Sequence, residues 1–423
     1  MNETKKNNKR KNKMNYIEKS QLLRERFNHN DKKIDIPELE TEILNIPFES
    51  ENYDILPGER SYNCKEHHTY FPPAPPVEEK NLHESIKKLI NVNDSSIKEN
   101  RFFSYPVMKK RGNGKAKKAI ILFHGLNEKS WDKYLPWAHK LMEQTGKAVI
   151  MFPIAFHMNR APAEWSNPRA MRKVVEEKKK LFPRTLKSSI ANAAINTRLQ
   201  FDPLRFMWSG LQSYYDVIQL VNSVRNGEYS FIEPDAKIDM FAYSIGSFLA
   251  EILLMADTSG FFKDSKLFNF CGGPVLTRTS PVSKYILDSE TNVSVYTFFM
   301  DYLDEEIKKD ERLKHYFDNG HMEGAVFRSM LDYRKKKEFR EEKFRILSKR
   351  IYALGLKQDE VIPPVEIINT LKGEKRNIPV KVKVMDLEYD YDHVIPFPSN
   401  WNIEKKVDKA FNKVFKIASK FLK

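Results

Sequence analysis

Three residues whose side chains can together activate a hydroxyl group occur along this chain in the order serine, aspartate, histidine. Ser244, Asp359 and His393 each follow a largely apolar run within a few residues. A serine hydroxyl becomes an effective nucleophile only when a base removes its proton, and a neutral histidine is such a base near physiological pH. An aspartate beside that histidine fixes its tautomer and stabilises its protonated form. These three residues are therefore the candidate catalytic residues, and the chemistry that they predict is acyl transfer to Ser244.

The serine lies in the segment KIDMFAYSIGSFLAEILL (residues 237–254), between a strand-like run and a helix-like run. Only residues 243–246 are available for the connection, so the chain must turn sharply and expose Ser244 at the turn. The small residues Ala242 and Gly246 suit so close a crossing. Ala242 occupies the place of the first glycine of the usual G-x-S-x-G motif, and a serine that only caps a helix gives a similar pattern. With Asp359 and His393 further along, we interpret the segment as a nucleophile elbow.

The remaining groups of the candidate site follow other predicted strands. Two backbone N–H groups form the predicted oxyanion hole: that of Ile245, directly after the nucleophile, and that of Leu126, in the loop after His124-Gly125. The spacing of Asp359 from the strand before it favours that residue as the acid. Three other carboxylates compete for this role because they lie beside Asp359 or His393 in the sequence: Glu360, Asp390 and Asp392.

The elements that must position these residues alternate between apolar strands and helices. The predicted strands cover residues 101–110, 118–123, 147–154, 237–243, 266–271, 349–355 and 380–386, and the predicted helices cover residues 81–92, 133–146, 203–227, 245–254 and 404–422. Continuous apolar strands that alternate with helices indicate an α/β fold with a parallel sheet buried on both faces. In such folds the reactive groups gather at the carboxyl ends of the strands, where the candidate residues lie.

The chain order Ser…Asp…His, with each residue just past a predicted strand, resembles that of the α/β-hydrolase superfamily. The resemblance covers about residues 100–423. It implies a mostly parallel, doubly wound sheet and a serine hydrolase that cleaves an ester, thioester or amide through an acyl-enzyme. The whole chain, particularly residues 152–169 (FPIAFHMNRAPAEWSNPR), is also similar to a bacterial hydrolase family of unassigned function. The alternatives are a catalytically degenerate binding protein of this fold and an interaction protein that uses its basic tail.

Two insertions, about residues 154–202 and 274–345, leave the predicted strands at their carboxyl ends and are expected to form a helical cap over the catalytic face. Their aromatic side chains either line a hydrophobic pocket or pack the core of the cap; they include Trp165, Tyr296, Phe298, Phe299 and Tyr302. Arg160 and Arg169 are candidates for binding an anionic group of the substrate. The predicted substrate-pocket residues are His124, Tyr243, Trp165 and Arg160, although His124 also suits a structural role in the oxyanion loop.

The charge of the 423-residue chain is +15, and residues 1–13, with six Lys or Arg and one Glu, contribute +5 of it. We expect these residues to be a disordered tail at the start of an N-terminal extension (residues 1–99), followed by a hydrolase domain (residues 100–423). Elsewhere acidic residues interleave with basic ones, so no specific nucleic-acid partner is predicted. The sequence has no apolar run of the ~20 residues that span a bilayer and no secretory signal, which favours a cytoplasmic location.

The cysteines and the remaining histidines predict no metal site and no cofactor. Cys64 and Cys271 are the only cysteines and lie far apart, which argues against a disulfide framework and a cysteine-based metal site. Cys271 ends an apolar strand and is expected in the core. Four histidines lack the spacing of metal ligands and are expected to be solvated: His67, His68, His83 and His157. The expected partner is a small-molecule acyl substrate, and the sequence gives no indication of the oligomeric state.

Overall fold

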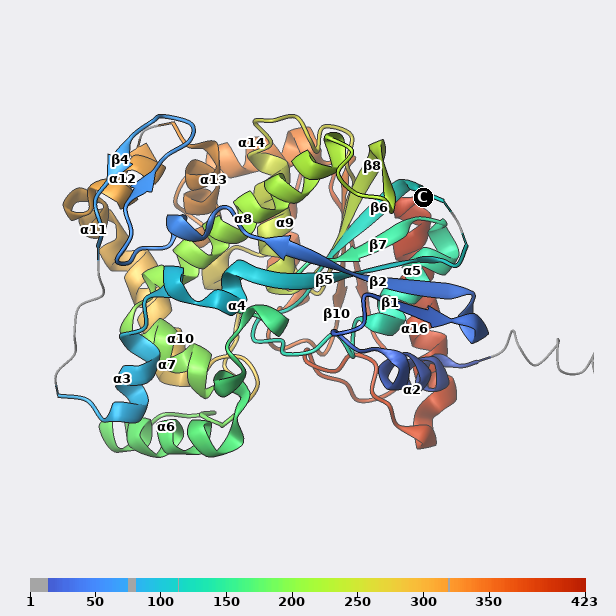
Figure 1. Ribbon diagram of the computed structural model, residues 1–423, viewed down its shortest axis with the longest axis horizontal. Coiled ribbons are helices and arrows are strands. Elements are labelled where there is room, and N and C mark those ends of the chain that lie inside the picture. Colours follow the sequence, from blue (N-terminus) through green and yellow to red (C-terminus); the bar gives the residue numbers. More distant parts are fainter. Residues whose placement is uncertain (1–13, 75–80, 113, 319) are drawn as a thin grey trace, which may run out of the picture.

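The computed structural model describes residues 14–74, 81–112, 114–318 and 320–423, and a nine-stranded sheet lies at its centre (Figure 1). The strand order in the sheet is β1-β2-β5-β7-β6-β8-β9-β10-β11. The bounds of these strands are Lys33–Ile36 (β1), Thr41–Glu49 (β2), Phe102–Lys110 (β5), Ala116–Phe123 (β6), Ala148–Met151 (β7), Ile232–Tyr243 (β8), Leu267–Phe270 (β9), Ile351–Leu356 (β10) and Lys381–Met385 (β11). A separate two-stranded sheet pairs β3 (Tyr62–Asn63) with β4 (Tyr70–Phe71).

The strands from β7 to β11 in this order are parallel, whereas β5 is antiparallel to both β7 and β2. The register places Ile121 of β6 opposite Ile150 of β7 and Met240 of β8. All three residues are fully buried because helices cover both faces of the sheet, which explains the uninterrupted apolar runs. The predicted α/β-hydrolase fold class is confirmed.

Each face of the sheet has its own layer of helices and its own hydrophobic core (Figure 1). One layer consists of α2 (Tyr16–Arg26), α5 (Leu135–Thr145) and α16 (Glu404–Leu422), and the other of α8 (Leu204–Arg225), α9 (Ile245–Met255), α14 (Lys337–Leu347) and α15 (Pro364–Lys372). The helix α5 ends at Gly146, whose φ of 71° is the left-handed conformation that glycine adopts without strain. The helix α16 buries one stripe of apolar residues, as its sequence period predicts.

The N-terminal segment is part of the main sheet. Strands β1 and β2 form an antiparallel pair, and β2 continues the sheet along all of β5. Helix α2 packs against α5 and α16. Residues 33–49, which we expected in a separate extension, therefore belong to the hydrolase sheet. The predicted disordered tail (residues 1–13) lies outside the described residues.

The two insertions form most of a helical cap at one end of the sheet (Figure 1). The first insertion contains η4 (Met158–Arg160), η5 (Ala163–Ser166), α6 (Pro168–Leu181) and α7 (Ala193–Phe201); the second contains η6 (Leu276–Arg278), α10 (Ser289–Thr297), the π-helical η7 (Phe298–Tyr302), α11 (Leu303–Lys309), α12 (Glu311–Asp318) and α13 (Met322–Leu331). The two insertions meet where α7 packs against α10, and α3 (Glu84–Ile90) packs against α6 and α7. The expected second insertion extends into α14, but α14 packs against α9 and α15 and so covers the sheet.

Four short helices complete the described elements: η1 (Pro37–Leu39), η2 (Tyr53–Ile55), η3 (Asp94–Ser96) and η8 (Trp401–Ile403), together with the single turn α4 (Lys98–Arg101). Within the described residues, none of the helices has the length and apolar character required to cross a bilayer.

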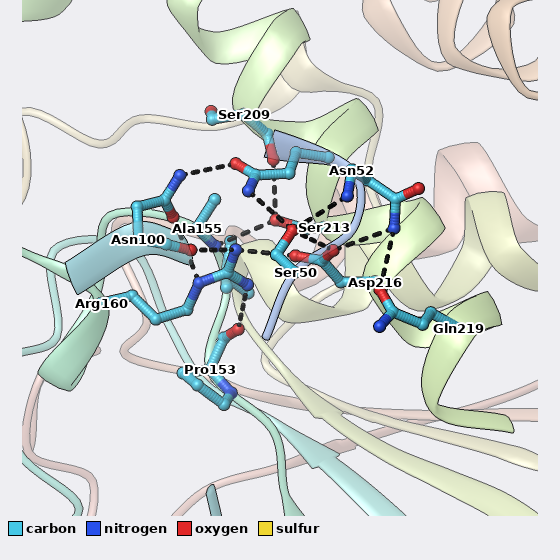
Figure 2. Close-up of polar contacts among 12 residues, drawn as sticks. Ser50, Asn52, Asn100, Pro153, Ala155, Arg160, Ser209, Ser213, Asp216 and Gln219 are labelled. Atoms are coloured by element: carbon cyan, nitrogen blue, oxygen red, sulfur yellow. Dashed lines mark hydrogen bonds and ion pairs between the residues drawn. The ribbon is translucent and has the colours of Figure 1, made fainter. Parts of the chain in front are cut away.

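A buried polar network fastens the N-terminal segment and the first insertion to α8 (Figure 2). The guanidinium of Arg160 lies 2.7 Å from Asp216 Oδ2, and both side chains are fully buried. Ser50 Oγ and Asn52 Nδ2 donate to Asp216 Oδ1 at 2.6 and 3.1 Å. Arg160 Nε donates to Asn100 Oδ1 at 3.2 Å. Removing one member of such a pair typically costs ~3–5 kcal/mol of stability because the partner's charge stays buried, so this network fixes how the segments are joined.

Candidate active site

Ser244 occupies the sharp turn between β8 and α9. Its φ and ψ angles are 56° and −124°, a sparsely populated conformation that costs energy in any residue with a side chain. The turn brings α9 very close to β6. A Cβ atom at Gly246 would lie only 2.7 Å from the carbonyl oxygen of His124, so no larger residue fits there without a shift of the backbone. The local structure is the strand–turn–helix that the sequence predicted.

The structure brings the three sequence-predicted side chains together. His393 Nε2 lies 2.8 Å from Ser244 Oγ, and His393 Nδ1 lies 2.8 Å from Asp359 Oδ2. Asp359 follows β10 and His393 follows β11, and all three side chains are buried. With Nδ1 donating to the carboxylate, Nε2 presents its lone pair to the serine hydroxyl. This is the arrangement in which a histidine can accept the proton of a nucleophile.

The carboxylate of Asp359 is held in place from its other side. Its Oδ1 accepts hydrogen bonds from the backbone N–H groups of Val361 at 3.0 Å and Ile362 at 2.8 Å. The competing carboxylates Glu360, Asp390 and Asp392 are all exposed. Asp392 Oδ1 instead accepts the N–H of Ile395 at 2.7 Å. Asp359 is thus the carboxylate that contacts His393.

His124 holds the loop that carries Leu126. Its Nδ1 donates to the carbonyl oxygen of Gly125 at 2.8 Å, and its Nε2 accepts the N–H of Ile154 at 3.0 Å. Complete burial lowers the pKa of His124 well below its usual value, so the ring is neutral and has one donor and one acceptor. Both ring nitrogens of His124 are thus bonded to the backbone, which is the structural role that the sequence also suited.

A charged network that the sequence did not predict joins the loop of Leu126 to the loop of His393. Lys133 pairs with Glu128 and donates to the carbonyl oxygen of Val394 at 3.1 Å. The hydroxyl of Tyr134 donates to Glu128 Oε1 at 2.9 Å and accepts the N–H of Gly125 at 2.9 Å. One indication of this network was present in the sequence: Glu128 and Lys133 follow shortly after Leu126, in the predicted oxyanion loop.

Tyr243 lies beneath the histidine. Its ring stacks on that of His393 with a centroid distance of 5.2 Å, and its hydroxyl donates to the carbonyl oxygen of His393. Burial raises the pKa of Tyr243 well above its usual value, which keeps this hydroxyl protonated as a donor. Tyr243 also lines the pocket that contains Ser244 and His393.

Two pockets of different character meet at Ser244, and Leu126 lines both. One is almost wholly apolar and includes Ile245 next to the serine; its other lining residues come mainly from the cap and α9 and include Leu199, Phe206, Phe248, Leu276, Ile286, Leu287, Val295 and Tyr296. The other pocket contains His393 and polar residues that follow Leu126 in the chain: Asn127, Glu128, Lys129, Ser130 and Lys133. Leu126 thus lies where the two pockets join, and Ile245 lines the apolar pocket.

Two other predicted pocket residues lie away from Ser244. Arg160 is fully buried in its pair with Asp216 and lines no described pocket, contrary to the prediction. Trp165 lines a neighbouring pocket that reaches Leu126, and the guanidinium of Arg198 lies 4.3 Å from its ring centre. Arg169 is exposed. The sequence places these residues in the first insertion but does not encode which way its short helices turn.

The expected roles of the other cysteines and histidines hold only in part. Cys271 is buried, and burial together with the charge of Asp359 raises the pKa of its thiol well above the usual value, which fits a core residue. His157, expected to be solvated, is buried. Cys64 and His67 lie within reach of one another and of two further histidines, contrary to our expectation that the chain lacks ligand spacing. These four residues bring together, away from Ser244, nitrogen and sulfur atoms of the kind that ligate metals.

The chain is similar, at low sequence identity, to several solved structures, and three of them are the following. Carboxyl esterase 2 from the mycorrhizal fungus Tuber melanosporum is 10% identical, with 76% of this chain and 81% of that chain covered and a TM-score of 0.42. A carboxylesterase from Lactobacillus plantarum is 10% identical, with 74% of this chain and 90% of that chain covered and a TM-score of 0.37. An acylaminoacyl peptidase from Pyrococcus horikoshii is 12% identical, with 75% of this chain and 39% of that chain covered and a TM-score of 0.37. The fold assignment rests on strand order and site geometry rather than on these scores.

Sequence comparison gives a single, broad assignment. No curated protein sequence matches the chain. Residues 14–423 match the family described as "Family of unknown function (DUF6051)", which covers nearly the whole chain, including the β1–β2 segment, the cap and the residues around Ser244. The chain therefore belongs to this family, and it has an α/β-hydrolase fold.

Proposed function

We propose that this protein is a serine hydrolase that cleaves an ester, thioester or amide through an acyl-enzyme. The observation that carries the proposal is the continuous contact from Asp359 through His393 to Ser244, with both hydrogen bonds at 2.8 Å. In the first step, His393 Nε2 takes the proton of Ser244 as its Oγ attacks the substrate carbonyl carbon. The histidine then gives this proton to the leaving group, and the acyl-enzyme forms. In the second step His393 takes a proton from water as the water attacks the acyl carbon, and the proton then passes to Ser244 Oγ as the acyl group leaves.

The tetrahedral intermediate carries a negative charge on the former carbonyl oxygen. We assign its stabilisation to the backbone N–H groups of Ile245 and Leu126, which belong to residues that line the pocket beside Ser244. The hydrogen bonds of His124 to Gly125 and Ile154 support this by holding the loop of Leu126 in place. Loss of one such donor typically reduces kcat by ~10²–10³.

The two pockets at Ser244 favour a substrate with one apolar side and one polar side. The apolar pocket is lined by Leu199, Phe206 and Phe248, among others, and suits an alkyl or aryl acyl group. The other pocket contains Lys129 and Lys133 next to His393, so it suits a polar leaving group. We therefore expect esters with a medium apolar acyl chain to be better substrates than acetate esters.

A fluorophosphonate probe tests the proposal directly because it reacts with an activated serine. We expect the full chain to be labelled once, on the peptide that contains Ser244, and the Ser244→Ala variant to remain unlabelled. A series of chromogenic esters of increasing acyl length would then measure the depth of the apolar pocket. Failure of both labelling and hydrolysis in folded protein would favour the alternative, a binding protein of this fold without catalysis.

A further inference from the structure

A group of four side chains with metal-binding atoms lies between the N-terminal segment and the cap. Cys64 and His67 lie in the turn of the β3–β4 hairpin, His315 lies on α12, and His321 directly precedes α13. The hairpin turn is closed by backbone hydrogen bonds from Cys64 N to the carbonyl oxygen of Thr69 at 2.9 Å and from the N–H of His68 to that of Cys64 at 2.8 Å. Cys64, His315 and His321 are buried, and His67 covers the cluster from the solvent side.

The distances among the four candidate ligand atoms fit a tetrahedral ion. His321 Nε2 lies 3.0 Å from His315 Nε2, 3.1 Å from His67 Nδ1 and 3.4 Å from Cys64 Sγ. The Cys64 Sγ to His67 Nδ1 distance is 3.8 Å. Bonds of ~2.0–2.1 Å to nitrogen and ~2.3 Å to sulfur at tetrahedral angles put ligand atoms ~3.3–3.6 Å apart. The four distances lie near these values, and all four ligand atoms lie within 4.8 Å of one another.

Hydrogen bonds among the side chains do not account for this convergence. Glu323 Oε1 lies 2.8 Å from His321 Nδ1 and accepts its N–H, so Nε2 presents its lone pair to the other side chains. Three other polar atoms lie within 3.4 Å of that nitrogen. One lone pair serves one or two donors well, whereas a cation at the common centre uses the lone pairs of all four atoms at once.

The surroundings of His321 are also those of a metal ligand. Glu323 holds the Nδ1–H of the ring, and the hydroxyl of Tyr215 donates to the same carboxylate oxygen at 2.6 Å. A carboxylate behind a ligating histidine orients the ring and makes the ligand more basic. Glu66 Oε2 lies 3.3 Å from the same Nδ1 and adds negative charge near the cluster.

We propose that Cys64, His67, His315 and His321 bind one zinc ion in a closed tetrahedral site. One thiolate with three imidazole nitrogens is a donor set that suits zinc, and the pair Cys64-x2-His67 has the short spacing of a zinc-binding turn. Four protein ligands leave no position for water, so the ion is structural and takes no part in hydrolysis. It clamps the β3–β4 hairpin onto α12 and α13.

The test uses the full chain, purified in the presence of zinc and dialysed against metal-free buffer. We expect about one zinc per chain by elemental analysis. Cobalt introduced in place of zinc should give the intense visible bands of a tetrahedral ion and a thiolate charge-transfer band. X-ray absorption at the zinc edge should show one sulfur at ~2.3 Å and three nitrogens at ~2.0–2.1 Å. These measurements require no variant and so do not depend on a mutant chain folding.

Variants then assign the ligands. Cys64→Ser and His321→Ala should each lower the bound zinc at least ~tenfold, since each removes a direct ligand. His68→Ala is the matched control, because it removes the adjacent exposed histidine of the same turn and should leave the zinc content unchanged. Wild-type chain that holds no metal, holds copper or iron instead of zinc, or keeps its zinc in both ligand variants would overturn the proposal.

Discussion

The rings of His393 and His321 have similar surroundings at Nδ1 and different surroundings at Nε2. Each ring has its Nδ1 2.8 Å from a carboxylate oxygen, that of Asp359 for His393 and that of Glu323 for His321. The Nε2 of His393 faces one atom, Ser244 Oγ, at 2.8 Å. The Nε2 of His321 faces three, from Cys64, His67 and His315.

The difference separates two uses of the same histidine–carboxylate pair. A ring that has a single hydroxyl partner can move a proton between that partner and a substrate. A ring whose second nitrogen faces three other potential ligand atoms is placed to share a cation with them, as we propose for His321. A buried histidine with an acidic partner therefore does not by itself indicate catalysis, and the number of atoms around its second nitrogen decides the assignment.

The largest effect is expected from removing the hydroxyl of Ser244, which should abolish hydrolysis and leave the metal cluster unchanged. Ser244→Ala should lower kcat for a chromogenic ester by on the order of 10⁶, because no other group at the elbow supplies the nucleophile. His393→Ala should be as damaging, and the double variant scarcely worse, since the two residues act in one step. Zinc content should be the same in all three. Losses that multiply in the double variant would show that the residues act independently.

The next effect concerns Asp359, the carboxylate that contacts His393 Nδ1. Asp359→Asn should lower kcat by ~10⁴, because an amide can hold His393 in the wrong tautomer. Asp390→Asn and Asp392→Asn are matched controls, since both side chains are exposed and neither contacts Nδ1. Steady-state kinetics of the three variants, together with Glu360→Gln, measure this. If Asp390→Asn or Asp392→Asn is inactive while Asp359→Asn keeps most of its activity, the acid is misassigned.

The equivalent change at the cluster should be milder and should appear in a different measurement. Glu323→Gln should weaken zinc binding by ~10–100-fold, the usual cost of losing the acceptor behind a ligating histidine. Competition with a chelator measures this affinity. Glu66→Gln is the control, because that carboxylate is exposed and lies 3.3 Å from His321 Nδ1 rather than 2.8 Å. An equal effect of the two substitutions would mean that only overall charge matters there.

The smallest effect concerns a buried carboxyl with no histidine beside it. Glu251 on α9 accepts a hydrogen bond from Asn269 at 2.7 Å, and complete burial raises its pKa well above the ordinary value of 4.5. At a pH above the ordinary value of 4.5, Glu251 is ionised in the unfolded chain but protonated in the folded chain, so it costs stability. At a pH below 4.5 it is protonated in both states, and this cost disappears. Glu251→Gln should therefore raise the Tm by about 1–2 °C at pH 7 and hardly at all near pH 4.

Differential scanning calorimetry at both pH values measures this change. Asn269→Asp is a useful opposite, because it would place a second acidic group beside Glu251 and should lower the Tm at neutral pH. A Tm of Glu251→Gln that is lower than that of the wild type at neutral pH would mean that the carboxyl is ionised in the folded protein.

The sheet and the residues around Ser244 were readable from the sequence because each lies within or just after a buried apolar run. The carboxyl-terminal halves of the parallel strands β6 and β8 are buried on both faces, so they end in apolar runs, and the residues that follow them meet at one edge. Strands β1 and β2 were missed. In β1 exposed and buried residues alternate over only four positions, which is a weak signal beside the charged residues on either side.

The cysteine–histidine cluster was missed because its members come from two parts of the chain about 250 residues apart in sequence. Each pair alone, Cys64 with His67 and His315 with His321, is too short a pattern to indicate a site. The orientation of Arg160 was unpredictable for a related reason. Its partner, Asp216, lies on α8, and only the folded chain shows that the short helix η4 directs this arginine inward.

The pairing of β2 with the full length of β5 has a consequence for how the protein must be handled. A fragment that began near residue 100 would keep the candidate catalytic residues but would expose β5, nine residues long, as an unpaired edge strand. Such an edge is a template for strands of other molecules and leads to aggregation. In the intact chain the exposed edge is instead β1, a four-residue strand that carries the charged residues Lys33 and Asp35. The N-terminal segment thus covers an edge of the sheet that would otherwise be open to strands of other molecules.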